Sequence, residues 1–308
     1  MINLVTGGAG LIGSHLVDEL LKRNEKVICL DNFHTGTKAN VEKFINLNNY
    51  QFIDHDVIHP IDLKVDKIWH FASPASPFIY QKDPILTSKI IIFGSINMLE
   101  IAKKNKAKIF LASTSEIYGN PKIIPQKEDY YGNANPIGKR SCYVESKRLS
   151  ESLFFDYLRT HNVDIRIARI FNTYGPGMRK DDGRVISNFI NQALKNKKIT
   201  IYGRGKQKRC FCYVEDMVAG IIKLMDSNYQ SPVNLGNPKE EFAINELGKL
   251  ITSKVNKKFK KNYLLQREDE PQIRKPDISL AKDLLKWIPK VDIDQGLGKT
   301  IDYFYSVY

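Results

Sequence analysis

Tyr143 and Lys147 stand four residues apart in the segment SCYVESK, a spacing suited to acid–base chemistry. Residues at i and i+4 share one face of a helix, so the phenol and the ammonium group are expected to be neighbours. A phenol with a pKa of about 10 is a poor base at neutral pH, but an adjacent positive charge favours its phenolate. The pair is therefore typical of a site in which a tyrosine takes a proton from a substrate hydroxyl.

A second polar group, Thr114-Ser115-Glu116, follows the apolar residues that begin with Leu111. Ligands of α/β proteins bind beyond the carboxyl ends of strands, so the triplet lies where chemistry is expected. A serine hydroxyl has far too high a pKa to serve as a general acid. Ser115 therefore does not donate a proton, and it either lies near substrate or only satisfies the adjacent backbone.

A glycine-rich segment, LVTGGAGLIGSH, follows the apolar run at 2–6 and precedes an amphipathic stretch. Its glycines allow a tight turn and let the backbone approach a pyrophosphate, whose charge is met by the helix N-terminus. Asp31 ends the next apolar run, where a carboxylate accepts hydrogen bonds from ribose hydroxyls and repels a 2′-phosphate, which favours NAD over NADP. The residues predicted to bind NAD are Gly7, Gly10, Leu11, Ile12, Gly13, Asp31, Asn32, Asp56, Val57, Ala72, Ser73, Tyr143 and Lys147.

Apolar runs alternate with helical patterns through the first half of the chain. Strands are expected at 2–6, 26–31, 68–73, 108–113 and 164–170, with helices between them that include 84–104 and a long one after Cys142. This alternation predicts an α/β fold, a Rossmann-type doubly wound parallel sheet. We expect an NAD-binding domain at 1–170 and a smaller α/β substrate-binding lobe at 171–308, with some of its segments returning to the first domain.

Composition narrows the class of protein. The 308 residues carry a net charge of +13, but the lysines are dispersed, which favours a solvated basic surface over a specific nucleic-acid site. No apolar run approaches the roughly 20 residues that span a bilayer, so no membrane partner is expected. The four cysteines have neither metal-ligand spacing nor the density of a disulfide framework, which predicts no metal site and a cytoplasmic location.

With the glycine motif, the strand-end hydroxyls and the Tyr143/Lys147 pair, the sequence resembles the extended short-chain dehydrogenase/reductase family of nucleotide-sugar enzymes. The resemblance implies that Tyr143 takes the proton of the sugar 4-hydroxyl while NAD takes the C4 hydride. It implies that Lys147 also holds the nicotinamide ribose and that Thr114 helps to bind O4. It further implies a homodimer, through the helices near 84–104 and 142–160.

Several segments are similar at a finer level to the UDP-glucuronate decarboxylase (UDP-xylose synthase) family: TSEIYG, NPIGKRSCYVESKR, RIFNTYGP, DGRVISNFI, FCYVEDM, PVNLGNP and RKPDISLAK. The resemblance implies that UDP-glucuronate is oxidised at C4, loses CO2 from C5 and is reduced again to UDP-xylose. In related dehydratases the triplet is Thr-Asp-Glu, whose aspartic acid protonates a departing hydroxyl. Decarboxylation needs no such acid, so Ser115 agrees with it.

The same resemblance assigns the remaining site residues. Glu116 lies near C5 and the leaving carboxylate, where it positions a water or disfavours the charged substrate. Arg274 reaches the sugar carboxylate, although a surface ion pair with a neighbouring acid is the alternative. The predicted substrate-binding residues are Asn172, Val185, Asn188, Tyr202, Gln207, Arg209 and Arg274. Three departures from the family pattern, Ile91, Gly177 and the milder Tyr131, leave rate and affinity open.

Two other functions remain open at this point. A UDP- or dTDP-sugar 4-epimerase or 4,6-dehydratase would use the same tyrosine and lysine, and Ser115 and Arg274 argue against it. A non-catalytic NAD-fold protein that binds RNA or a protein partner would agree with the +13 charge, but the intact Tyr143/Lys147 pair argues against it.

Overall fold

A parallel sheet of seven strands forms the centre of the computed structural model, which describes residues 1–307. Its strand order is β11-β6-β5-β4-β1-β2-β3, and every neighbouring pair is parallel. Both faces of such a sheet are buried, which is why most residues of its central strands β1 and β5 are apolar. The predicted fold class is confirmed. The strands are β1 (Ile2–Thr6), β2 (Lys26–Asp31), β3 (Tyr50–Asp54), β4 (Lys67–His70), β5 (Lys108–Thr114), β6 (Ile165–Ile170) and β11 (Val233–Leu235).

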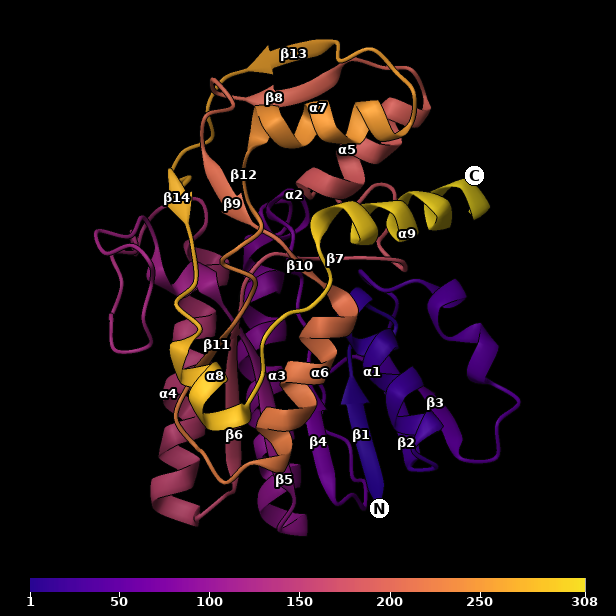
Figure 1. Cartoon of the computed structure of the whole chain (residues 1–308). Helices are drawn as coiled ribbons and strands as arrows, with labels where there is room; N and C mark the ends of the chain where they lie inside the picture. The colour runs from indigo at the N-terminus through magenta and orange to yellow at the C-terminus, as the bar shows by residue number, and fades with distance from the viewer. Residues whose placement is uncertain (308) are drawn as a thin grey trace.

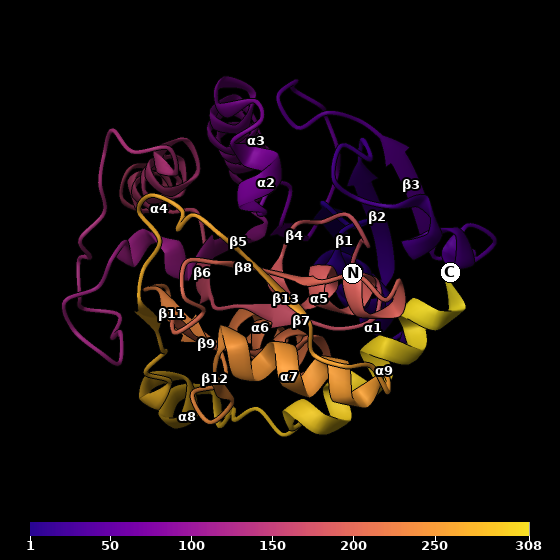
Figure 2. The ribbon, with the colours of Figure 1, turned by 90° about the horizontal axis from the view of Figure 1, so that it is seen from above.

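Helices cover both faces of the sheet (Figure 2). On one face α3 (Pro84–Asn105) packs along α4 (Ser141–His161), and on the other α1 (Leu11–Lys22) packs against α6 (Val214–Asp226). The start of α3 is fixed by its sequence, because Asp83 accepts a hydrogen bond from the backbone N–H of Leu86 and Pro84 needs no donor there.

Helix α3 differs from the expectation drawn from apolar runs. By length and composition α3 is apolar enough to cross a membrane. The search for an uninterrupted apolar run did not find this helix, because polar residues interrupt its apolar sequence. Half of its most apolar window is buried, against α4, β4 and β5. Core helices of globular proteins meet the same criterion, so this is weak evidence for a membrane span.

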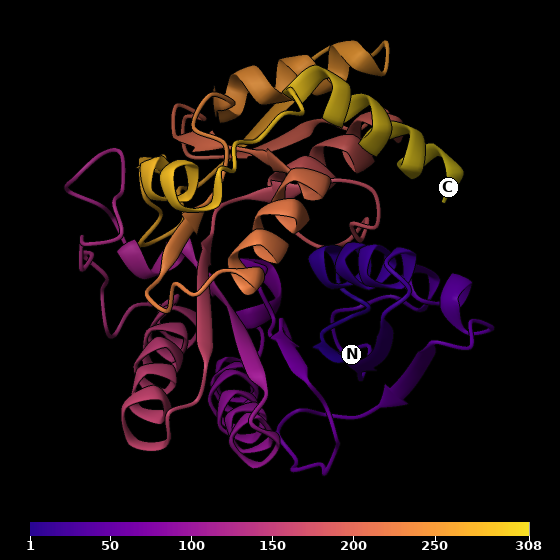
Figure 3. The same cartoon turned by 60° about the horizontal axis from the view of Figure 1, so that its bottom comes forward.

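The second half of the chain builds a lobe over the carboxyl ends of the strands, as Figures 1 and 3 show. Its small sheets are β7 with β10, β8 with β13, and β12-β9-β14. Two elements of this half return to the first domain, because β11 joins the central sheet and α6 packs on that sheet. The domain boundary at residue 170 stays a prediction. The lobe and its connections comprise β7 (Thr173–Tyr174), α5 (Val185–Leu194), β8 (Ile199–Tyr202), β9 (Lys208–Cys210), β10 (Cys212–Tyr213), β12 (Glu241–Ala243), α7 (Ile244–Lys254), β13 (Lys261–Leu264), β14 (Ile273–Arg274), α8 (Ser279–Leu285) and α9 (Ile293–Ser306).

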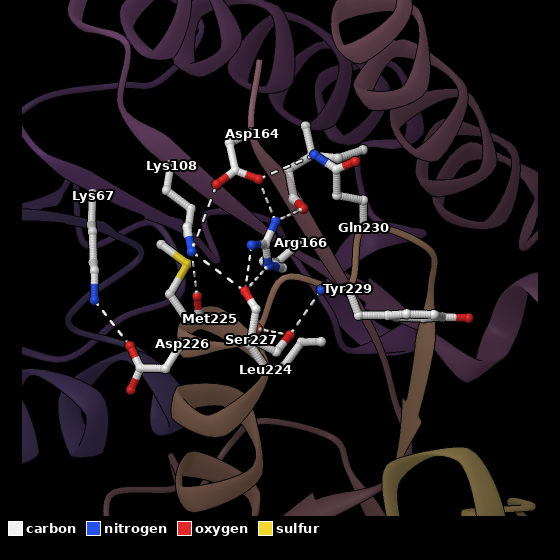
Figure 4. A network of polar contacts seen from close by, with 11 residues as sticks. Lys67, Lys108, Asp164, Arg166, Leu224, Met225, Asp226, Ser227, Tyr229 and Gln230 are labelled. Atoms are coloured by element: carbon white, nitrogen blue, oxygen red, sulfur yellow. Dashed lines mark hydrogen bonds and ion pairs between the residues drawn. The ribbon is translucent and has the colours of Figure 1, made fainter. Parts of the chain in front are cut away.

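A polar network closes the opposite, amino edge of the sheet (Figure 4). The buried Arg166 of β6 donates through Nε to the carbonyl of Ser227, at 2.9 Å, and pairs with Asp164. Lys108 donates to the carbonyl of Met225 at 3.2 Å. Cations here satisfy the last carbonyls of α6 and meet the negative end of its dipole. The network therefore joins α6 to the sheet far from the strands' carboxyl ends.

Replacing this arginine is expected to destabilise the fold without touching the chemistry. Arg166→Met removes the charged donor of the Ser227 carbonyl, which keeps a longer 3.4 Å hydrogen bond from Lys108, and should cost about 1.5 to 3 kcal/mol of unfolding free energy. Urea unfolding measures the loss. The matched control is Arg159→Met, whose exposed ion pair with Asp156 should contribute almost nothing. Equal losses in the two variants would contradict this account.

Candidate active site

One cavity runs beneath the lobe along the carboxyl ends of the central strands, and its first half is a backbone cradle. Gly7 has a φ of +70°, which favours glycine, and a Cβ on Gly13 would stand 2.3 Å from the Gly7 carbonyl oxygen. The loop can therefore fold tightly against the N-terminus of α1, which begins after Gly10. The open helix end and bare backbone suit a pyrophosphate.

Asp31, at the end of β2, is held in place beside this cradle. Its Oδ2 accepts a hydrogen bond from the backbone N–H of Ala9 at 3.0 Å, and its Oδ1 accepts one from Phe33 at 2.8 Å. Burial raises the pKa of Asp31, and these backbone donors oppose that shift. Asn32 donates to Asp56 at 3.1 Å. The carboxylate of Asp31 is held in place by backbone N–H groups and can accept hydrogen bonds from ribose hydroxyls. Together with the backbone cradle, it fits a dinucleotide.

All but one of the predicted cofactor residues line this cavity. The residues that do so are Gly7, Gly10, Leu11, Ile12, Gly13, Asp31, Asn32, Asp56, Val57, Ala72, Ser73 and Tyr143. The exception is Lys147, which is buried beneath the cavity and donates to the Ala112 carbonyl at 2.8 Å.

Tyr143 and Lys147 both lie in the first two turns of α4, and burial affects the pKa values of both. Burial raises the pKa of Tyr143, the charge of Glu116 raises it further, and a hydrogen bond with Thr114 acts in the other direction. Burial lowers the pKa of Lys147 to about 7, against the charge of Glu151. Burial therefore opposes the charged forms of both groups, whereas the expectation that a lysine ammonium favours phenolate stays a prediction. A four-residue spacing cannot reveal this desolvation.

Glu116 is held from three directions. Arg140 approaches its Oε2 to 2.6 Å, Tyr80 donates to the same oxygen at 3.2 Å, and Arg274 approaches Oε1 to 3.4 Å. Burial by itself would raise the pKa of Glu116, but the charges of Arg140 and Arg274 and the hydrogen bonds lower it to about 2. The carboxylate is therefore ionised although it is buried.

The two arginines predicted to meet substrate come from neighbouring strands of the lobe. Arg274 of β14 is buried and pairs with the buried Glu116 instead of a surface acid, and its Nε has no hydrogen-bond partner among residues 1–307. Arg209 of β9 pairs with Glu270 at 3.3 Å, and burial and the charge of Arg274 lower its pKa to about 10. Two partly satisfied guanidinium groups in one cavity suit an anionic ligand.

The other predicted substrate residues also line the cavity: Asn172, Val185, Asn188, Tyr202 and Gln207. The ring of Tyr202 is covered by the guanidinium of Arg267, 3.8 Å from its centroid. Thr114 and Ser115 line the cavity beside Glu116.

Of the three departures from the family pattern, Ile91 and Gly177 lie close to the site. Ile91 is buried in an apolar cluster with Tyr80 and Tyr143. Gly177 has a φ of +88° and lies against Asn40, while Arg179 lines the cavity and donates to the Thr35 carbonyl at 3.4 Å.

Two residues of the site were missed by the sequence reasoning. The ring of Tyr80, in α2 (Pro77–Tyr80), stacks on that of Tyr143 with centroids 4.9 Å apart and planes 2° apart. Arg140 stands at the N-cap of α4. A cation there opposes the helix dipole, and that misfit was a signal available in the sequence. Within residues 1–307, no group of three or more His, Cys, Asp or Glu side chains could hold a metal.

Comparisons with known proteins agree with one another. Residues 3–236 match the model of the NAD dependent epimerase/dehydratase family. The chain is 50% identical over 301 residues to UDP-glucuronic acid decarboxylase 1 of Xenopus tropicalis, covering 98% of this chain and 71% of that protein. It is 51% identical to UDP-glucuronic acid decarboxylase 3 of Arabidopsis thaliana, with 96% and 86% covered. Among solved structures, the chain is similar to the UDP-glucuronic acid 4-epimerase of Bacillus cereus in complex with UDP-glucuronic acid and NAD. The match has a TM-score of 0.91 and 31% identity and covers 100% of each of the two chains.

Proposed function

The chain belongs to the NAD dependent epimerase/dehydratase family, and on that premise we propose that it converts UDP-glucuronate to UDP-xylose and CO2 as an NAD-dependent decarboxylase. Its relatives at about half identity over nearly the whole chain are UDP-glucuronic acid decarboxylases, whereas the epimerase neighbour is more distant. The proposal is carried by one observation of the site. The buried Arg274 has a donor without a partner beside the ionised Glu116, in the cavity that also contains the dinucleotide cradle.

Tyr143 begins the reaction in this proposal. The cradle from Gly7 to Gly13 and Asp31 would hold NAD, which would supply an acceptor for the C4 hydride of the sugar and its return at the end of the cycle. Tyr143 accepts the O4 proton, with Thr114 positioning that hydroxyl. Because burial raises the pKa of Tyr143, the phenol needs a positive neighbour before it becomes a base. Lys147 in its protonated form is that neighbour within the chain.

Loss of CO2 then needs an electron acceptor and no acid. The bond between C5 and the carboxylate breaks, CO2 leaves, and the electron pair moves into the C4 carbonyl to form an enolate. Arg274 binds the substrate carboxylate before the bond breaks. Afterwards C5 takes a proton from water, and O4 takes one from Tyr143, so that the site is restored. Glu116 acts at C5, either on that water or on the charged substrate.

The test is to incubate the protein with UDP-glucuronate and NAD and to follow the sugar nucleotide by proton NMR. UDP-xylose without net NADH is the expected result. A 4-keto pentose with stoichiometric NADH would show that the last step is lost. Conversion of UDP-glucose or dTDP-glucose instead would overturn the assignment.

Cofactor choice provides a separate prediction. Asp31→Ala removes the oriented acceptor, so NAD should bind about tenfold more weakly, the equivalent of one charge-assisted hydrogen bond. The affinity for NADP should stay the same or rise, because the negative charge that repels its 2′-phosphate is gone. Isothermal titration of both nucleotides measures this. Asp62→Ala, an exposed acid that pairs with Lys104, is the control and should change neither affinity. A loss of affinity equal for NAD and NADP would contradict the role of Asp31.

We propose in addition that the chain forms a homodimer through α3 and α4. Ile85, Phe93 and Leu149 on these helices expose 71%, 45% and 43% of their surface, and an apolar depression on α3 lies beside them. Burying such side chains is favourable. Light scattering at micromolar concentration should give about twice the monomer mass, and Phe93→Glu should give a monomer.

A cytoplasmic location is also proposed, supported by the free state of Cys29, Cys142, Cys210 and Cys212. Imaging a tagged full-length chain in its own cells tests it.

A further inference from the structure

The two oxygens of Glu116 have unequal partners. Oε2 is held by Arg140 at 2.6 Å and by the hydroxyl of Tyr80, whereas Oε1 is approached, within the described residues, by Arg274 alone, at 3.4 Å. Arg140 and Glu116 are both buried, so water does not replace either partner readily. One oxygen is therefore fixed by the protein, and the other faces a guanidinium that still has an unused donor.

Arg274 has two tasks that compete. Its guanidinium pairs with Glu116 here, and in the proposed function it binds the carboxylate of the substrate. If it turns to the substrate, Glu116 loses one of its two cations while a second carboxylate arrives nearby. Two carboxylates sharing a buried site cannot both stay ionised without another positive charge. Arg140 lines the same cavity and is the cation that remains.

We propose that Arg140 is a positioning residue of this reaction: it keeps Glu116 ionised and fixed through Oε2, which frees Arg274 to bind the substrate carboxylate. This inference rests on the proposed function for the identity of the substrate. The part that concerns Glu116 itself rests on the contacts alone. The main chain of Arg140 begins α4 by accepting bonds from the N–H groups of Tyr143 and Val144, and substitution of its side chain leaves those bonds in place.

Other groups facing Glu116 do not substitute for Arg140. Tyr80 and Tyr143 are phenols, which are neutral when protonated, and burial raises their pKa values so that they stay protonated. Neither side chain therefore supplies a positive charge. Arg209 is paired with Glu270. The titratable and charged groups around Glu116 are Tyr80 from α2, Arg140, Cys142 and Tyr143 from the start of α4, Arg209 from β9 and Arg274 from β14.

The kinetic test compares Arg140→Met with Arg140→Lys by kcat and KM for UDP-glucuronate at several pH values between 5.5 and 8.5. In Arg140→Met the burial of Glu116 is opposed mainly by Arg274, so the pKa of Glu116 should rise by about four units from its wild-type value of about 2. Because kcat/KM follows the ionised fraction of Glu116, it should then fall about fourfold more between pH 8 and pH 5.5 than in the wild type. Arg140→Lys keeps the charge and should restore the wild-type pH profile at a reduced kcat. Arg159→Met, at the exposed end of the same helix, is the control and should leave kinetics unchanged.

A second measurement separates this inference from the proposed function. The carboxyl carbon of Glu116, labelled with 13C and assigned by its loss in Glu116→Gln, is titrated by NMR in the protein without substrate. Its midpoint should lie at a higher pH in Arg140→Met than in the wild type. An unchanged midpoint, or a uniform loss of kcat at every pH with no change of profile, overturns the positioning role. Absence of UDP-glucuronate turnover in the wild type, with the midpoint shifted, would refute only the substrate.

Discussion

Tyr143→Phe is expected to lower the turnover of UDP-glucuronate by about 10²- to 10⁴-fold, the range for loss of a general acid–base group. The substitution removes one hydroxyl, and the phenyl ring can still stack on Tyr80. Folding and NAD affinity should therefore stay close to those of the wild type. Single-turnover NMR with excess enzyme, together with thermal unfolding and NAD titration, measures all three quantities.

The control for this variant is Tyr157→Phe, on the same helix, where the hydroxyl donates to the exposed Glu100 and lies away from the cavity. It should retain activity within about twofold. If Tyr143→Phe retained comparable activity, another group would have to accept the O4 proton, and the assignment of the base would be wrong.

Lys147→Met is expected to abolish turnover and to make the protein more stable at low pH. Because burial lowers the pKa of Lys147 from 10.5 to about 7, the unfolded chain binds this proton more tightly than the folded protein does. The penalty is complete below pH 7, where the folded protein must carry a buried ammonium group. It is relieved as pH rises from about 7 to 10.5, since the folded lysine is then neutral while the unfolded one keeps its proton.

Thermal unfolding of the wild type and Lys147→Met at pH 6 and at pH 9 tests this sign. The advantage of the variant should be larger at pH 6 and smaller at pH 9. Lys104→Met, which removes an exposed ammonium paired with Asp62, should show no such trend. A variant that is less stable than the wild type by the same amount at both pH values would show that the hydrogen bond to Ala112 outweighs desolvation.

The sequence by itself determined five of the seven strands of the sheet, the cofactor cradle and the reacting pair, since each depends on local patterns, whereas β3 and β11 lie outside the predicted ranges. Strands β1, β2 and β6 lie within a residue of their predicted ranges, because apolar runs between helical patterns can only be buried strands. Strand β4 ends at His70, earlier than expected, because the chain turns there towards the cavity. The glycine spacing specified the turn before α1, because the backbone at Gly13 lies so close to the carbonyl of Gly7 that a Cβ would not fit between them.

Only the tertiary structure decided the electrostatics of the site. Glu116 and Arg274 are 158 positions apart, so no local pattern shows that they meet. Arg140 and Tyr80 come to the same carboxylate from two further segments. Burial then raises the pKa of Tyr143 and lowers that of Lys147, which their spacing along α4 does not show. The physical reason is that desolvation depends on every element packed around a group, whereas sequence spacing specifies only its neighbours along one helix.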